Sequence, residues 1–169
     1  MDQDLMMKKI VEEVMRAMGG SAPAGSPSYN TGGEVSAAQY PLCEKVPEKI
    51  KSPSGKSLAD MNLEQMLSGE LTAEDMRISP ETLELQAQVA ESVGRDAFAA
   101  NLRRASELIA VPDDRVLEMY NSLRPYRCTK AELYAIADEL QNQYGAKINA
   151  AFVREAADVY EQRGRLKKA

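Results

Sequence analysis

Histidine, which most often acts as acid, base or metal ligand near neutral pH, does not occur among the 169 residues of this sequence. Nucleophile pairs of the Ser-His and Cys-His kind are therefore excluded. The two cysteines, Cys43 and Cys128, stand far apart without a C-x-x-C spacing, so the usual zinc patterns are absent as well. We expect both to be free thiols without a catalytic function.

Two other features match catalytic or nucleotide-binding signatures only in part. The string Ser54-Gly55-Lys56-Ser57 ends like a phosphate-binding loop, but that motif needs a glycine where this chain has Ile50, and no strand is expected before it. Neighbouring carboxylates such as Asp138 and Glu139 are explained by a solvated helix face. The sequence therefore predicts no catalytic, cofactor-binding or metal-binding residue in this chain.

Arginine near tyrosine is the remaining pattern with a chemical use, because both residues are enriched among those that dominate protein interfaces. Arg103 and Arg104 lie in the middle of an alanine-rich helix, while Arg124 and Arg127 flank Pro125-Tyr126. Ion pairs with acidic residues of the helices would explain the first two without a partner, so both interpretations stay open. The predicted partner-interface residues are Arg103, Arg104, Arg124, Tyr126 and Arg127.

The composition favours a mainly α-helical protein. Aromatic residues make up only 5% of the chain and tryptophan is absent, so the core must use aliphatic side chains and many alanines. The 26 acidic against 21 basic side chains give a formal net charge of −5, which argues against nucleic acid as a partner. No apolar run approaches the roughly 18 residues that span a bilayer. We expect an intracellular protein that binds neither nucleic acid nor membrane.

Beyond residue 60, caps, apolar spacing and terminating glycines or prolines predict a succession of helices. A long helix opens at Ser79-Pro80 and is expected to break or kink at Gly94. A short helix is predicted at 62–69 and longer ones at 112–124, 129–145 and 148–163, with Phe98 and Phe152 among the apolar positions expected to face the core. Between residues 40 and 56, prolines recur about every six residues, so this arm is predicted to be extended or irregular and not helical.

The N-terminal segment has a pattern of its own. An apolar stripe at helical spacing is formed by Met7, Ile10, Val11, Val14 and Met18. Small and polar residues with glycine and proline follow, which indicates a flexible linker. Acids interleaved with the stripe argue against a secretion signal or a basic membrane-surface helix. We therefore predict three parts: an amphipathic docking helix at 1–18, a linker at 19–38 and a helical domain at 39–169.

Several strings between residues 40 and 168 form a collinear pattern. They include Tyr40-Pro41-Leu42, Asp75-Met76-Arg77-Ile78-Ser79, Tyr120-Asn121-Ser122-Leu123-Arg124-Pro125 and Asn149-Ala150-Ala151-Phe152-Val153-Arg154-Glu155. Together they resemble the small subunit of the adenosylcobalamin-dependent diol and glycerol dehydratases. Many matches in the same order are far more specific than any single motif.

This resemblance implies a helical small subunit that assembles with a large and a medium subunit, the whole forming a dimer of heterotrimers. It implies that adenosylcobalamin, held between the large and medium subunits and not by this chain, supplies the radical that removes water from 1,2-propanediol, glycerol or ethanediol. The small subunit would support assembly and contribute no catalytic residue.

The extra N-terminal piece favours a member that acts on propanediol, because glycerol-acting members tend to start near the Tyr-Pro-Leu string. A short amphipathic helix with a linker also resembles the tags that bring enzymes into bacterial microcompartments. We therefore expect a bacterial cytoplasmic protein, packaged through contact of its N-terminal helix with a shell or cargo protein. Two alternatives stay open: the small subunit of a glycerol dehydratase, or an unrelated helical binding or regulatory module with a docking helix.

Overall fold

The computed structural model describes residues 29–168. The predicted docking helix at 1–18, with Met7, Ile10, Val11, Val14 and Met18, lies outside the described residues, as does the predicted linker up to residue 28. Within the described part every regular element is an α- or 3₁₀-helix, apart from one isolated antiparallel bridge between Lys51 and Ser57. The prediction of a mainly α-helical fold is confirmed.

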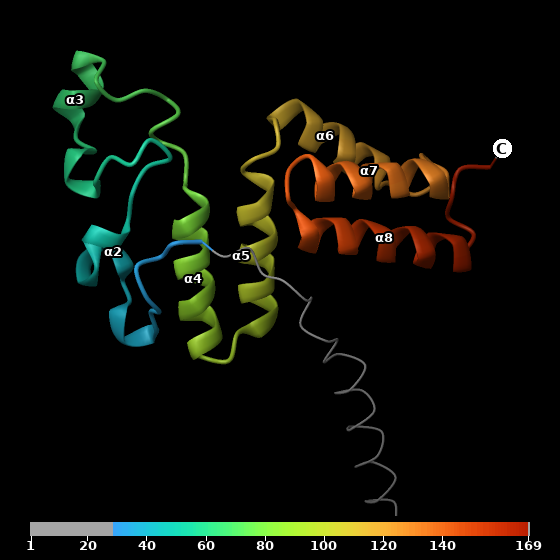
Figure 1. Cartoon of the computed structure of the whole chain (residues 1–169), viewed down its shortest axis with the longest axis horizontal. Helices are drawn as coiled ribbons and strands as arrows, with labels where there is room; N and C mark the ends of the chain where they lie inside the picture. The colour runs from blue at the N-terminus through green and yellow to red at the C-terminus, as the bar shows by residue number, and fades with distance from the viewer. Residues whose placement is uncertain (1–28, 169) are drawn as a thin grey trace, which may run out of the picture.

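Two helical hairpins form the framework (Figure 1). α4 (Pro80–Ser92) pairs with α5 (Asp96–Leu108), and α7 (Lys130–Asn142) pairs with α8 (Lys147–Gln162). The hairpins meet where α5 packs against α8, and α6 (Asp113–Ser122) connects them along the chain. None of the helices in residues 29–168 is long and apolar enough to cross a membrane.

Local signals place the helix ends. The Ser79 hydroxyl accepts the N–H of Thr82 at 3.2 Å and Pro80 occupies the first turn of α4. The break predicted at Gly94 is a complete reversal, because this residue adopts a left-handed φ of 72° between α4 and α5. The predicted capping box of Thr129 and Glu132 opens α7, with the Thr129 N–H donating to the Glu132 carboxylate at 2.7 Å.

The larger apolar core lies between α6, α7 and α8. Leu133 and Leu140 of α7 are buried there against Val153 of α8, together with several alanines. A second contact joins α4 to α5 through Ala87, Ala90 and Ala99. Because alanine carries no bulk beyond Cβ, the two helices approach closely while their larger side chains are left at the rims of the contact.

The proline-containing arm lies along α4. The prediction that residues 40–56 contain no helix was wrong, because α2 (Leu42–Lys45) and a 3₁₀ turn at Pro47–Lys49 fall within them. Each is a single turn, and a proline at or just before its first residue has a fixed φ that suits a helix start. A 3₁₀ turn at Ala37–Gln39 precedes them, and Val35 is already buried with Leu42 and Leu85. The packed chain thus begins inside the segment predicted as a linker.

Candidate partner-binding surface

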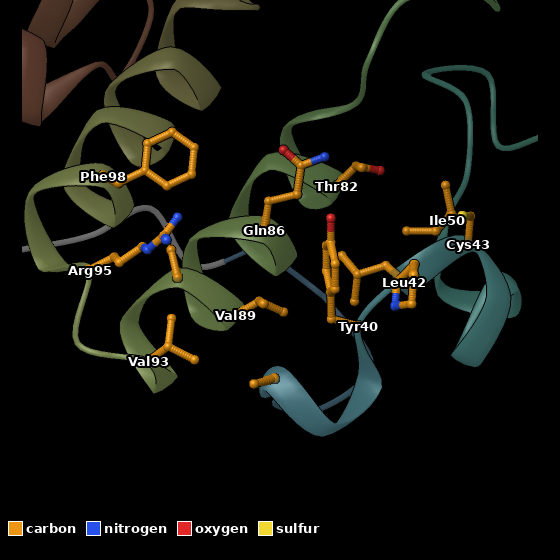
Figure 2. Close-up of a pocket in the computed structure, with 13 residues that line it drawn as sticks. Tyr40, Leu42, Cys43, Ile50, Thr82, Gln86, Val89, Val93, Arg95 and Phe98 are labelled. Carbon is orange, nitrogen blue, oxygen red and sulfur yellow. The ribbon is translucent and has the colours of Figure 1, made fainter.

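An open apolar groove of about 670 Å³ lies between the arm and the α4–α5 hairpin (Figure 2). The arm contributes Tyr40 and Leu42, α4 contributes Val89, the C-cap of α4 contributes Val93, and α5 contributes Phe98. Tyr40, Val93 and Phe98 are large apolar side chains that are at least half exposed. A concentration of such side chains on one surface is typical of a site that another protein covers.

The polar lining of the groove is sparse. Thr82 and Gln86 project from α4, and Figure 2 shows the rings of Tyr40 and Phe98 on opposite sides of Gln86. Arg95 is the one charged residue among the described residues that line the groove, and Cys43 adds a free thiol. None of the described residues that line the groove is a carboxylate. Its chemistry suits the burial of an apolar segment, with one guanidinium available for an acidic group.

The sequence predicted that Phe98 and Phe152 face the core, and the structure corrects this. Phe98 is 52% exposed at the edge of the groove, and Phe152 is 44% exposed on α8. Apolar periodicity identifies the hydrophobic face of a helix, but the neighbouring helix determines how much of that face is buried. The groove escaped detection because its aromatic residues lie 58 positions apart in the sequence.

Of the predicted interface residues, Arg103 is engaged inside the chain. Its guanidinium donates to Glu91 at 2.8 Å and to Glu84 at 3.1 Å, both on α4. These two carboxylates raise the pKa of Arg103, and the hydrogen bond from Arg103 lowers the pKa of Glu91. Arg103 therefore joins α5 to α4, and the acids that neutralise it come from the neighbouring helix.

Arg104 points the other way, toward α8. Its guanidinium lies 5.0 Å from the centre of the Phe152 ring and donates to the side-chain oxygen of Asn101. The guanidinium and the ring are both only partly covered, so together they form a small cationic and aromatic surface.

Arg124, Tyr126 and Arg127 lie together in the exposed turn between α6 and α7. Tyr126 adopts a left-handed φ of 66°, which is uncommon for a tyrosine, and its N–H donates to the Arg165 carbonyl at 2.7 Å. The Arg165 guanidinium lies 5.5 Å from the Tyr126 ring. This turn is far from Arg104, because α8 extends roughly 17 Å between Phe152 and Arg163 at 1.5 Å per residue.

The described residues form no group of three or more side chains with metal-ligand chemistry. Their buried side-chain nitrogen and oxygen atoms all have hydrogen-bond partners. The groove, the Arg104–Phe152 pair and the Arg124–Arg127 turn are surface features that each suit contact with a protein.

Comparison with known proteins identifies the family. Residues 35–167 match the dehydratase small subunit family, a range that contains the groove and all five predicted interface residues. The chain belongs to this family. The alternative of an unrelated helical regulatory module is thereby set aside.

Curated members of the dehydratase small subunits are similar over nearly their whole length. The propanediol dehydratase small subunit of Salmonella typhimurium is 55% identical over 154 residues, which cover 90% of this chain and 89% of that protein. The propanediol dehydratase small subunit of Citrobacter freundii is 52% identical over 164 residues, covering 96% and 94% respectively. The resemblance seen in the scattered strings thus extends through the chain.

Proposed function

We propose that this chain is the small, non-catalytic subunit of a propanediol dehydratase, a hydro-lyase that converts 1,2-propanediol to propionaldehyde. The observation that carries this proposal is the 55% and 52% identity to two propanediol dehydratase small subunits, over about nine tenths of each chain. Its role is to support assembly of the complex.

Two ion pairs between helices are consistent with this role. Glu139 accepts two hydrogen bonds from Arg115, at 2.9 and 2.6 Å, and these lower its pKa. The Lys130 ammonium lies 2.9 Å from the Asp158 carboxylate, and this pairing lowers the pKa of Asp158. Carboxylates held ionised by cations join helix to helix, whereas a general acid or base needs a pKa near the working pH.

The proposed cofactor, adenosylcobalamin, belongs to the larger subunits in this scheme. The groove does not fit a cobalamin, because the amide groups around a corrin ring need hydrogen-bond partners and the described residues that line the groove are mainly aliphatic and aromatic. No step of the radical reaction is therefore assigned to this chain.

The proposed partners are the large and medium dehydratase subunits, in a dimer of heterotrimers. The proposed contacts are the groove, the half-buried Arg104 and the exposed residues Arg124, Tyr126 and Arg127, since aromatic and arginine side chains dominate many interfaces. Arg103 would act indirectly, by holding α5 against α4.

The N-terminal segment is proposed to bring the complex into a bacterial microcompartment through a shell or cargo protein. Its apolar stripe is the sequence feature that supports this. The alignment with the Citrobacter freundii subunit covers 96% of this chain, so it includes most of the first 28 residues. The segment is thus shared with a propanediol dehydratase.

The direct test is to co-express the tagged chain with the large and medium subunits of a propanediol dehydratase from the same source. We expect the three chains to purify in equal amounts, with turnover of 1,2-propanediol only when adenosylcobalamin and all chains are present. Failure to assemble, or turnover by the isolated chain, would contradict the proposal. A marked preference for glycerol would favour the glycerol dehydratase alternative.

A further inference from the structure

The segment 57–78, which we name the α3 excursion, leaves the body of the molecule and returns to the start of α4. It contains α3 (Leu63–Ser68), at the end of the molecule remote from the α7–α8 hairpin (Figure 1). Leu63, Met66 and Leu67 stand at i, i+3 and i+4, so they share one face of α3. They are 69%, 48% and 79% exposed, and no residue of α3 is buried.

This exposure is unusual, because an amphipathic helix in a folded domain normally places its apolar face against a core. Among residues 29–168, none covers the apolar face of α3. The return segment adds two more exposed apolar side chains, Met76 and Ile78. A lone exposed leucine needs no explanation, but an uncovered helix face combined with further apolar side chains indicates a contact surface.

The shape of the excursion is held by a polar hub, so it does not depend on burying these side chains. The buried Asp75 carboxylate accepts hydrogen bonds from the Lys56 ammonium at 3.0 Å and from the N–H and hydroxyl of Thr72 at 2.8 and 2.9 Å. Ser54 also donates to it. Leu71 is buried, and its N–H donates to the Gln65 carbonyl at 3.0 Å. A preformed surface loses little conformational entropy when it binds.

Charge indicates what covers this face. Four exposed carboxylates lie on the excursion, and none forms a salt bridge within residues 29–168: Asp60, Glu64, Glu70 and Glu74. Its one exposed cation, Arg77, is paired with Asp113 at 2.8 Å. A complementary surface is apolar at its centre and basic at its rim. Two copies meeting through this face would bring like charges together, which disfavours self-association here.

We infer that the α3 excursion is a docking element that places Leu63, Met66 and Leu67 in an apolar, basic-rimmed depression on a larger subunit of the same dehydratase. This inference rests on the proposed function, which supplies the larger subunit. It goes beyond it by naming the surface that makes the contact.

The test uses the complete complex with Leu67→Asp in the small subunit, and Leu117→Asp as the matched control. Leu117 lies on α6 and is 61% exposed. We expect Leu67→Asp to reduce the affinity of the small subunit for the larger subunits by roughly tenfold or more, and Leu117→Asp to leave it unchanged. Because both side chains are exposed, both variants should unfold at the wild-type urea concentration.

A photo-crosslinking residue at position 66 identifies the occupant. An adduct with a larger dehydratase subunit supports the inference, and an adduct with a second copy of this chain overturns it. Wild-type affinity of Leu67→Asp, or an equal loss in Leu117→Asp, also overturns it. If the wild-type chain itself fails to assemble, the proposed function fails instead, so the two failures are distinguishable.

Discussion

Among individual residues, the buried carboxylates of this small subunit perform structural work between distant parts of the chain. Glu107 on α5 accepts the N–H groups of Ile148 and Asn149, each at 2.9 Å, and the side-chain amide of Asn149 at 2.8 Å. α8 begins after Ala146, which offers no capping side chain. Glu107 therefore caps α8 from another helix, and its negative charge suits the positive end of that helix.

Glu107→Gln should destabilise the chain by about 1.5 to 3 kcal/mol, because a neutral amide accepts fewer and weaker hydrogen bonds from the start of α8. Urea unfolding of the purified chain measures this difference. Glu155→Gln, an exposed change on α8, is the control and should stay within about 0.5 kcal/mol of wild type. Equal stability of the two variants would show that the cap contributes nothing.

Asp75 links stability to pH. Hydrogen bonds from Ser54, Thr72 and Lys56 hold the pKa of its carboxyl well below the usual range. The pKa of Asp75 is lower in the folded than in the unfolded chain, where it is about 3.9. The ionised carboxylate therefore contributes its full stabilisation of the fold above that pH, and this contribution is lost as the pH falls below it. We expect Asp75→Asn to be less stable than wild type at pH 7, with a smaller difference at pH 3. Urea unfolding at both values checks this, and a constant difference would contradict it.

These two residues also mark what sequence reasoning misses. The Thr129–Glu132 cap was predictable because its partners are three residues apart. Glu107 lies 41 and 42 residues from the N–H groups that it accepts, and Asp75 is 19 residues from Lys56. Such pairs depend on how the helices pack, and a local sequence pattern does not predict that packing.

At the scale of elements, the helices from α3 onward were predicted close to their observed positions, because caps, prolines and glycines act locally. The break at Gly94 was predicted, but whether it was a kink or a reversal was not. The turns of the arm were missed, since single helical turns have no apolar periodicity. The exposed position of Phe98 was missed because the alanine contact between α4 and α5 leaves the helix rims uncovered.

Gly94→Ala should destabilise the chain by about 1 kcal/mol. An added Cβ would meet nothing within 4 Å, so the expected cost arises from the left-handed backbone alone. Gly94→Asn should cost less, because asparagine adopts this conformation more readily. Thermal or urea unfolding of the two variants measures the difference. A larger loss in the asparagine variant would show that the side chain, and not the backbone, determines the effect.

At the scale of the whole molecule, membership of the dehydratase small subunits was predictable from scattered strings, because many collinear matches are specific to one family, whereas the groove was not predictable. The groove combines residues of the arm with both helices of the α4–α5 hairpin. The Arg104 and Tyr126 surfaces lie at opposite ends of α8 although both were predicted from similar local patterns. A subunit that exposes several separate apolar and aromatic surfaces is suited to a place within a larger assembly.

The apolar stripe of the N-terminal segment stands apart in sequence from the packed domain. Replacing Ile10 and Val14 with glutamate places charges in the stripe, while glutamate keeps a good helix propensity. If the proposed packaging role holds, we expect a complex with wild-type turnover that is more soluble and no longer enters the microcompartment, because the predicted helix has a length that is marginal in water and would depend on burial of its apolar face.

Turnover of the purified complex and the fraction of dehydratase recovered with isolated microcompartments provide the two measurements. Glu12→Gln with Glu13→Gln is the control, because it alters two polar positions of the same segment and leaves the stripe intact. Its packaging should match wild type. Loss of turnover in the Ile10→Glu, Val14→Glu complex would place the segment in the working enzyme, and unaltered packaging would show that the stripe is not what the compartment recognises.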